Sequence, residues 1–133
     1  MSTDRELLQA AAKAAGIEVG DDDFTDEIGR KYSDGLGLWV LSISDRPDLG
    51  GKWFNPLNNN GDALQIAMTL RMNLCIAMNG CIAQVEIVNV KKKSLDRYAA
   101  TRRAIVEAAA EWQIRRERRS LRAAAALGEQ HDQ

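Results

Sequence analysis

The first hydrophobic pattern along the chain is helical. Thr3 and Glu6 form a Thr-x-x-Glu capping box, and leucines and alanines then recur at helical spacing as far as Gly16. Gly16 suits the left-handed conformation that follows many helix C-termini. These signals predict a helix over residues 3–15.

The next apolar segment has the character of a strand. Residues 38–43 are rich in β-branched and aromatic side chains, which is typical of a buried strand. We expect a shorter strand near residues 28–32 to pair with it. Residues 45–52 contain a proline and two adjacent glycines, so they are predicted to form a loop.

A second helix and a hairpin follow. Three asparagines at 58–60 offer caps for a helix over residues 61–72, and Asn73 can end that helix in the left-handed region. Asn79-Gly80 then separates two β-like runs, at 74–78 and 81–87. This dipeptide favours a type I′ turn, because both turn positions need positive φ.

A turn at Asn79-Gly80 would pair Met78 with Cys81 and so divide the hairpin into two faces. The apolar face, which we expect to meet the helices, contains Leu74, Ile76, Met78, Cys81, Ala83, Val85 and Ile87. Cys75 lies on the opposite face from Cys81, which excludes a disulfide between them in this register. We expect both thiols to be reduced.

The last helix is predicted to extend beyond the core. Ser94 and Asp96 can cap it, and an apolar stripe continues from Tyr98 to Trp112. Past Ile114 the stripe ends in an arginine-rich segment, although helix propensity stays high. We therefore predict a single domain over residues 1–114, followed by an arginine-rich helical extension and a frayed tail over 115–133.

The order of elements predicts the fold class. With 133 residues, 45% of them hydrophobic, the chain has the size and composition of one globular domain. Hairpin-linked strands need no crossover helices, so the sheet should be antiparallel. We predict an α+β fold in the order α-β-β-α-β-β-α, with a sheet of about 3–4 strands covered by helices and a long C-terminal helix.

Catalytic and metal-binding patterns are missing from the sequence. The single histidine is His131, near the end of the chain, and no nucleotide-binding or nucleophile motif occurs. We therefore expect no enzyme, no cofactor and no metal site. Asp21, Asp22 and Asp23 carry oxygen ligands that suit calcium or magnesium, but their spacing differs from that of an EF-hand. A solvated acidic loop, or a negative patch for a basic partner, explains them better.

The net charge of −1 is unevenly distributed, because residues 1–60 carry 11 acidic and 6 basic side chains and residues 61–133 carry 8 acidic and 12 basic ones. The main basic cluster consists of Arg115, Arg116, Arg118, Arg119 and Arg122. It can serve as a solvated face, as a self-association surface with Ile114 and Leu121, or as a contact for phosphates and nucleic acid. The sequence pI of about 5.8 argues against a dedicated DNA-binding domain.

Trp53 and Phe54, beside the glycine-rich loop, are candidates for a ligand pocket or partner site, although packing in the core explains them more simply. The segments Trp53–Leu57 and Gly61–Leu64, together with Asp4–Leu8 and Tyr98–Val106, resemble small phage and prophage proteins of unknown function that are related to the phage alpha-beta-alpha sandwich domain. The resemblance brings no catalytic residues with it.

This resemblance suggests a phage accessory protein that acts by binding, most simply by blocking a host protein such as a defence component. A nucleic-acid-binding factor and a protein that sequesters a small molecule or nucleotide are the alternatives. The sequence contains neither an apolar run long enough to span a membrane nor the layout of a signal peptide, so we expect the host cytoplasm as its location.

Overall fold

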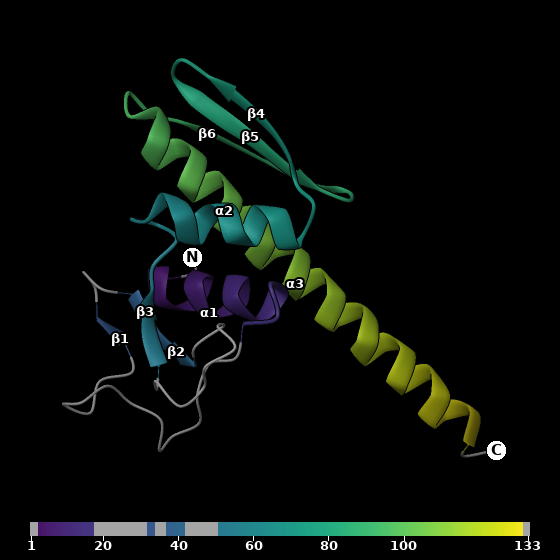
Figure 1. Cartoon of the computed structure of the whole chain (residues 1–133). Helices are drawn as coiled ribbons and strands as arrows, with labels where there is room; N and C mark the ends of the chain where they lie inside the picture. Colours follow the sequence, from purple (N-terminus) through teal and green to yellow (C-terminus); the bar gives the residue numbers. More distant parts are fainter. Residues whose placement is uncertain (1–2, 18–31, 34–36, 42–50, 132–133) are drawn as a thin grey trace.

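A computed structural model describes residues 3–17, 32–33, 37–41 and 51–131 of the chain. Within these residues there are three helices and six short strands, and three strands lie between each helix and the next along the chain (Figure 1). The helices are α1 (Asp4–Ala14), α2 (Asn60–Thr69) and α3 (Arg97–His131). The strands are β1 (Tyr32–Ser33), β2 (Gly37–Leu41), β3 (Gly51–Phe54), β4 (Asn73–Ala77), β5 (Gly80–Val85) and β6 (Val88–Lys93).

The strands form two antiparallel sheets, in the orders β1-β2-β3 and β4-β5-β6. The predicted α+β class, the antiparallel pairing and the long C-terminal helix are therefore confirmed. The predicted order of elements lacked β3 and β6, and it placed all strands in one sheet. Three consecutive lysines hide β6 in the sequence, since strand-forming valines occupy only its first half.

The β4–β5 hairpin is present, but its turn lies one residue earlier than predicted, and it is not of type I′ because neither turn residue has a positive φ. Ala77 pairs with Gly80, so Met78 and Asn79 form the turn and Ile76 pairs with Cys81. Gly80 is the first residue of β5, and the position requires glycine because a Cβ there would lie 2.3 Å from the Lys92 carbonyl oxygen of β6. The change of register is an even number of residues, so Leu74, Ile76, Cys81, Ala83 and Val85 keep the face predicted for them. The prediction is wrong for Met78 and Ile87, which lie in turns and are 84% and 75% exposed.

The helix termini follow the polar residues that precede them. The Thr3 hydroxyl accepts a hydrogen bond from the Glu6 N–H, and the Asn59 side chain accepts one from the Asp62 N–H. Gly16 ends α1 at φ 71°, as predicted. After α2 the left-handed residue is Arg71, at φ 54°, and not Asn73, which already begins β4.

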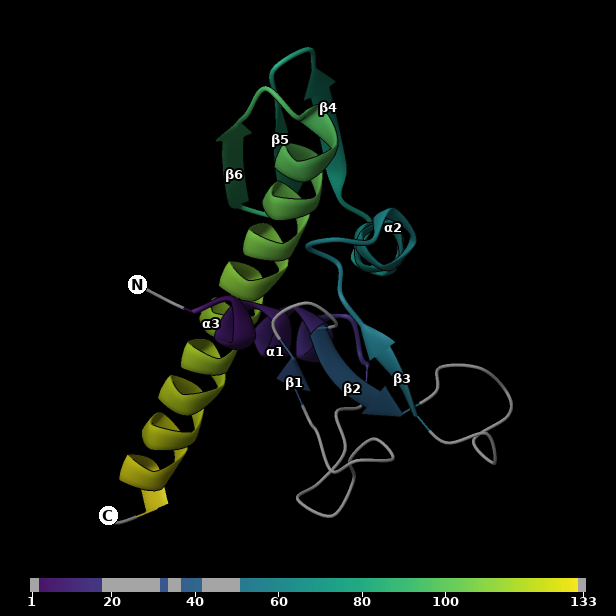
Figure 2. The same ribbon diagram turned by 90° about the vertical axis from the view of Figure 1, so that its left-hand side faces the viewer.

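The long helix α3 runs past α1 and the β4-β5-β6 sheet (Figure 2). It contributes residues to two hydrophobic clusters. One cluster joins α1, β2, β3 and α2 to the middle of α3, and the other joins β5 and β6 to the same helix. Trp112 contacts both clusters. The predicted stripe is confirmed at Ile105, Ala108 and Ala109, which are buried, whereas Tyr98 is 56% exposed at the start of the helix.

Beyond the residues that contribute to these two clusters, α3 projects away from the other helices and strands (Figure 1). Residues 121–127 are all exposed, and the helix continues to His131, where the sequence predicted a frayed tail. No helix among the described residues is both long enough and apolar enough to cross a membrane.

Candidate arginine-rich binding site

Four of the five clustered arginines lie on one face of the projecting part of α3. Arg115, Arg118, Arg119 and Arg122 are three, four and seven residues apart, which places them on one side of a helix. They line an open hollow of about 410 Å³, and the other wall is the β5–β6 turn at Glu86 and Ile87. We call these four side chains the arginine face.

Two of the four arginines of the arginine face have a carboxylate partner within the molecule. Arg115 Nε donates to Glu111 Oε1 at 2.9 Å, and an Arg119 guanidinium nitrogen lies 3.9 Å from Glu86 Oε2. Arg118 and Arg122 form no ion pair with any residue that the structure describes. Two guanidinium groups are therefore available for an anion outside the molecule.

The turn opposite the arginines contributes an apolar side chain. Ile87 is 75% exposed and lines the hollow beside the four arginines. Glu86 adopts φ 52°, a left-handed conformation that is uncommon for residues other than glycine, asparagine and aspartate. The hollow thus combines positive charge with one exposed aliphatic group.

The fifth arginine is separated from the others. Arg116 stacks over Trp112, with its Cζ 5.2 Å from the ring centroid, and lines a different hollow with Lys13 and Glu117. There the Gln113 amide donates to Glu117, and Lys13 Nζ lies 2.9 Å from the same carboxylate. These two contacts hold the pKa of Glu117 below its usual value.

The structure places the other sequence candidates elsewhere. Asp21, Asp22 and Asp23 lie outside the described residues. Phe54 is fully buried in the core and Trp53 is partly buried, which agrees with the packing interpretation. Among the described residues, no group of three or more histidine, cysteine, aspartate or glutamate side chains is placed to hold a metal ion.

The two cysteines differ in accessibility. Cys75 is exposed and Cys81 is buried, and both are free thiols. Burial raises the pKa of Cys81 above its ordinary value, and a hydrogen bond with Thr101 opposes this effect only in part. Cys75 is therefore the thiol that reagents and other molecules can reach.

Sequence reasoning did not find the wall of the hollow formed by Glu86 and Ile87. Their proximity to α3 depends on β6, which returns the chain along β5 and brings the turn against the helix. The available signal was Val88-x-Val90, a short alternation that would have predicted a third strand. Predicting that strand would also have predicted the turn at Glu86 and Ile87 that connects it to the preceding strand.

No protein-family model, no curated protein and no solved structure matches the chain.

Proposed function

We propose that this protein acts by binding, and that the arginine face of α3 holds an acidic surface of a partner protein. The observation that carries the proposal is the pair Arg118 and Arg122, two exposed guanidinium groups without an ion pair among the described residues. Guanidinium groups bind carboxylates in a bidentate manner and are enriched at protein interfaces.

A protein partner explains the hollow better than a nucleic acid does. Ile87 is exposed among the arginines, where an apolar group of a partner protein can cover it and a phosphate backbone cannot. Glu86 and Glu111 also offset part of the positive charge. The whole chain has a net charge of −1, so it lacks the general attraction of a basic nucleic-acid-binding domain.

Following the resemblance to phage proteins, we propose that the partner is a host protein such as a defence component. Binding is then sufficient for the effect, because a masked surface inhibits without catalysis.

Affinity capture from a bacterial lysate tests the proposal with matched variants. Arg118→Gln/Arg122→Gln removes the two free charges, and Lys91→Gln/Lys93→Gln removes two exposed charges from β6 as the control. We expect a specific protein that resists nuclease treatment to be retained by the wild type and the lysine variant and lost with the arginine variant. Equal retention by all three would refute a role for the arginine face.

A second variant distinguishes the protein partner from a nucleic acid. Ile87→Ser leaves every charge in place and removes the apolar contact. We expect it to weaken capture of the protein. Recovery of nucleic acid alone, with a steep loss on added salt and no effect of Ile87→Ser, would instead identify a phosphate-binding helix.

A further inference from the structure

The two edges of the β4-β5-β6 sheet differ in chemistry. The outer edge strand β6 carries Lys91, Lys92 and Lys93, and lysines on an edge strand discourage pairing with another chain. The other edge strand, β4, has the sequence Asn-Leu-Cys-Ile-Ala and no charged residue. Among the described elements, none pairs with the free edge of β4 (Figure 2).

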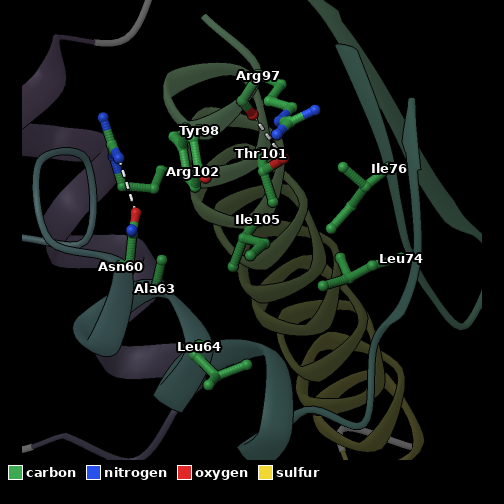
Figure 3. Close-up of a pocket in the computed structure, with 10 residues that line it drawn as sticks. All are labelled: Asn60, Ala63, Leu64, Leu74, Ile76, Arg97, Tyr98, Thr101, Arg102 and Ile105. Atoms are coloured by element: carbon green, nitrogen blue, oxygen red, sulfur yellow. Dashed lines mark hydrogen bonds between the residues drawn. The ribbon is translucent and has the colours of Figure 1, made fainter. Parts of the chain in front are cut away.

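The inner face of β4 is covered only in part: Leu74 packs against the hydrophobic clusters, whereas Ile76 is exposed. Helix α3 packs along β5 and β6 and barely contacts β4. An open groove of about 250 Å³ therefore remains between β4, α2 and α3, as Figure 3 shows. Ile76 from β4, Leu64 from α2 and Tyr98 from α3 line it, and they are 57%, 52% and 56% exposed.

The hairpin register determines which backbone groups β4 offers at its free edge. A two-residue loop is closed by a hydrogen-bonded pair, here Ala77 and Gly80. Hydrogen-bonded pairs alternate along the ladder, so Asn73, Cys75 and Ala77 direct their backbone groups toward β5. Leu74 and Ile76 direct theirs outward, and they can bind one further strand.

We propose that this strand is β4 of a second copy of the chain, antiparallel and related by a twofold axis at Cys75. In this register Leu74 of each copy pairs with Ile76 of the other, and all the outward backbone groups of Leu74 and Ile76 are satisfied. The dimer then contains a continuous six-stranded sheet.

A second copy suits the edge because the strand is uncharged and complementary to itself. Two β4 strands meet without like-charge repulsion, whereas two β6 strands would bring lysine clusters together. Leu74 and Ile76 of the added strand point to the same face as those of β4, toward the groove. One contact therefore covers the free edge and apolar groove of both copies, as a symmetric interface requires.

Sedimentation analysis over a range of concentrations measures the state of the chain directly. We expect the wild type to reach twice the 14.7 kDa mass of one chain, and Ile76→Lys to stay at 14.7 kDa. Ile76 is more than half exposed, so the lysine should not prevent folding, which circular dichroism checks. Asn89→Lys, at an exposed position of β6, adds the same charge to the other edge and should leave the dimer intact.

A cysteine experiment tests the register. Opposed Cys75 residues would form a non-hydrogen-bonded pair with Cα atoms about 4.5 Å apart, which a disulfide can span. Diamide, which accepts two electrons and two protons from two thiols, should give a covalent dimer of the wild type and of Cys81→Ser, but not of Cys75→Ser. Cys75→Ser/Ala77→Cys is the control for random collision, because the two new thiols would be about 13 Å apart along the strands.

Three outcomes would overturn the proposal. The first is a chain that stays monomeric up to its solubility limit. The second is a dimer that Ile76→Lys leaves intact, which would place the interface elsewhere, for example on α3. The third is cross-linking through position 77 as fast as through Cys75, which would show collision in place of a fixed register.

Discussion

Replacing Asp62 with alanine should destabilise the fold through a residue far from the arginine face. The Asp62 carboxylate accepts a hydrogen bond from the Asn55 N–H at 2.9 Å, and its own N–H donates to Asn59. Asn55 is only 8% exposed, so its N–H would lose a charged acceptor and gain little access to water. An unsatisfied buried donor costs about 1–3 kcal/mol. Loss of a carboxylate in the first turn of a helix costs about 0.3–1 kcal/mol more.

We therefore expect Asp62→Ala to lower the free energy of unfolding by about 1–4 kcal/mol. For a chain of this length that corresponds to a fall in Tm of roughly 4 °C per kcal/mol. Urea titration measures the free energy and thermal melting measures Tm, each followed by circular dichroism. Asp62→Asn keeps an oxygen acceptor without the charge and should lose about half as much, since neutral hydrogen bonds are weaker. Equal stability of the wild type and both variants would refute the proposed role of this carboxylate.

Two further changes test the backbone and the charge network. Gly37→Ala should destabilise more than Gly16→Ala: both glycines have positive φ, but a Cβ at Gly37 would lie 2.2 Å from a carbonyl oxygen of β3, whereas one at Gly16 meets nothing within 4 Å. Urea titration should show a loss of roughly 1–2 kcal/mol at Gly16 and a clearly greater one at Gly37; the opposite order would contradict the close approach. The pKa of Glu117 is lowered by hydrogen bonds from Gln113 and Lys13, so its contribution to stability is present above the ordinary carboxyl pKa and lost as pH falls through the lowered value. The free energy of unfolding should thus be higher for the wild type than for Glu117→Gln at neutral pH, and the two values should become equal in acid. A difference that persists in acid would show that the charge of Glu117 is not its cause.

Local signals in the sequence predicted the features that depend on local interactions. The caps at Thr3 and Asn59, the left-handed Gly16 and the β4–β5 hairpin all arise from residues within a few positions of one another. The failures have a common physical origin. The turn lies one residue earlier than predicted, with Gly80 in the strand, where it is approached closely by β6; that contact comes from another strand and is not encoded locally.

The candidate site shows the same division between local and tertiary information. The arginine cluster and its helical spacing were evident from the chain. The separation of Arg116 from the other four follows from the same helical spacing, and Trp112 adds only the ring over which its guanidinium stacks. Ile87 entered the site only through the folding of β6, and the groove beside β4 exists because α3 packs on β5 and β6. None of these tertiary placements can be derived from periodicity.

The projecting part of α3 behaves thermodynamically as a peptide helix attached to a preformed nucleus. From Arg115 to His131 it extends about 25 Å, and residues 121–127 are exposed, so backbone hydrogen bonds and side-chain propensity maintain it there without a core. The costly first turn is already fixed inside the protein, and melting should therefore proceed inward from the free end. The arginine face lies in the first two turns after the core and would be the last part of the projection to unwind. Its arginines thus keep their helical spacing while the alanines beyond them fray, and a partner need not supply the free energy to order them.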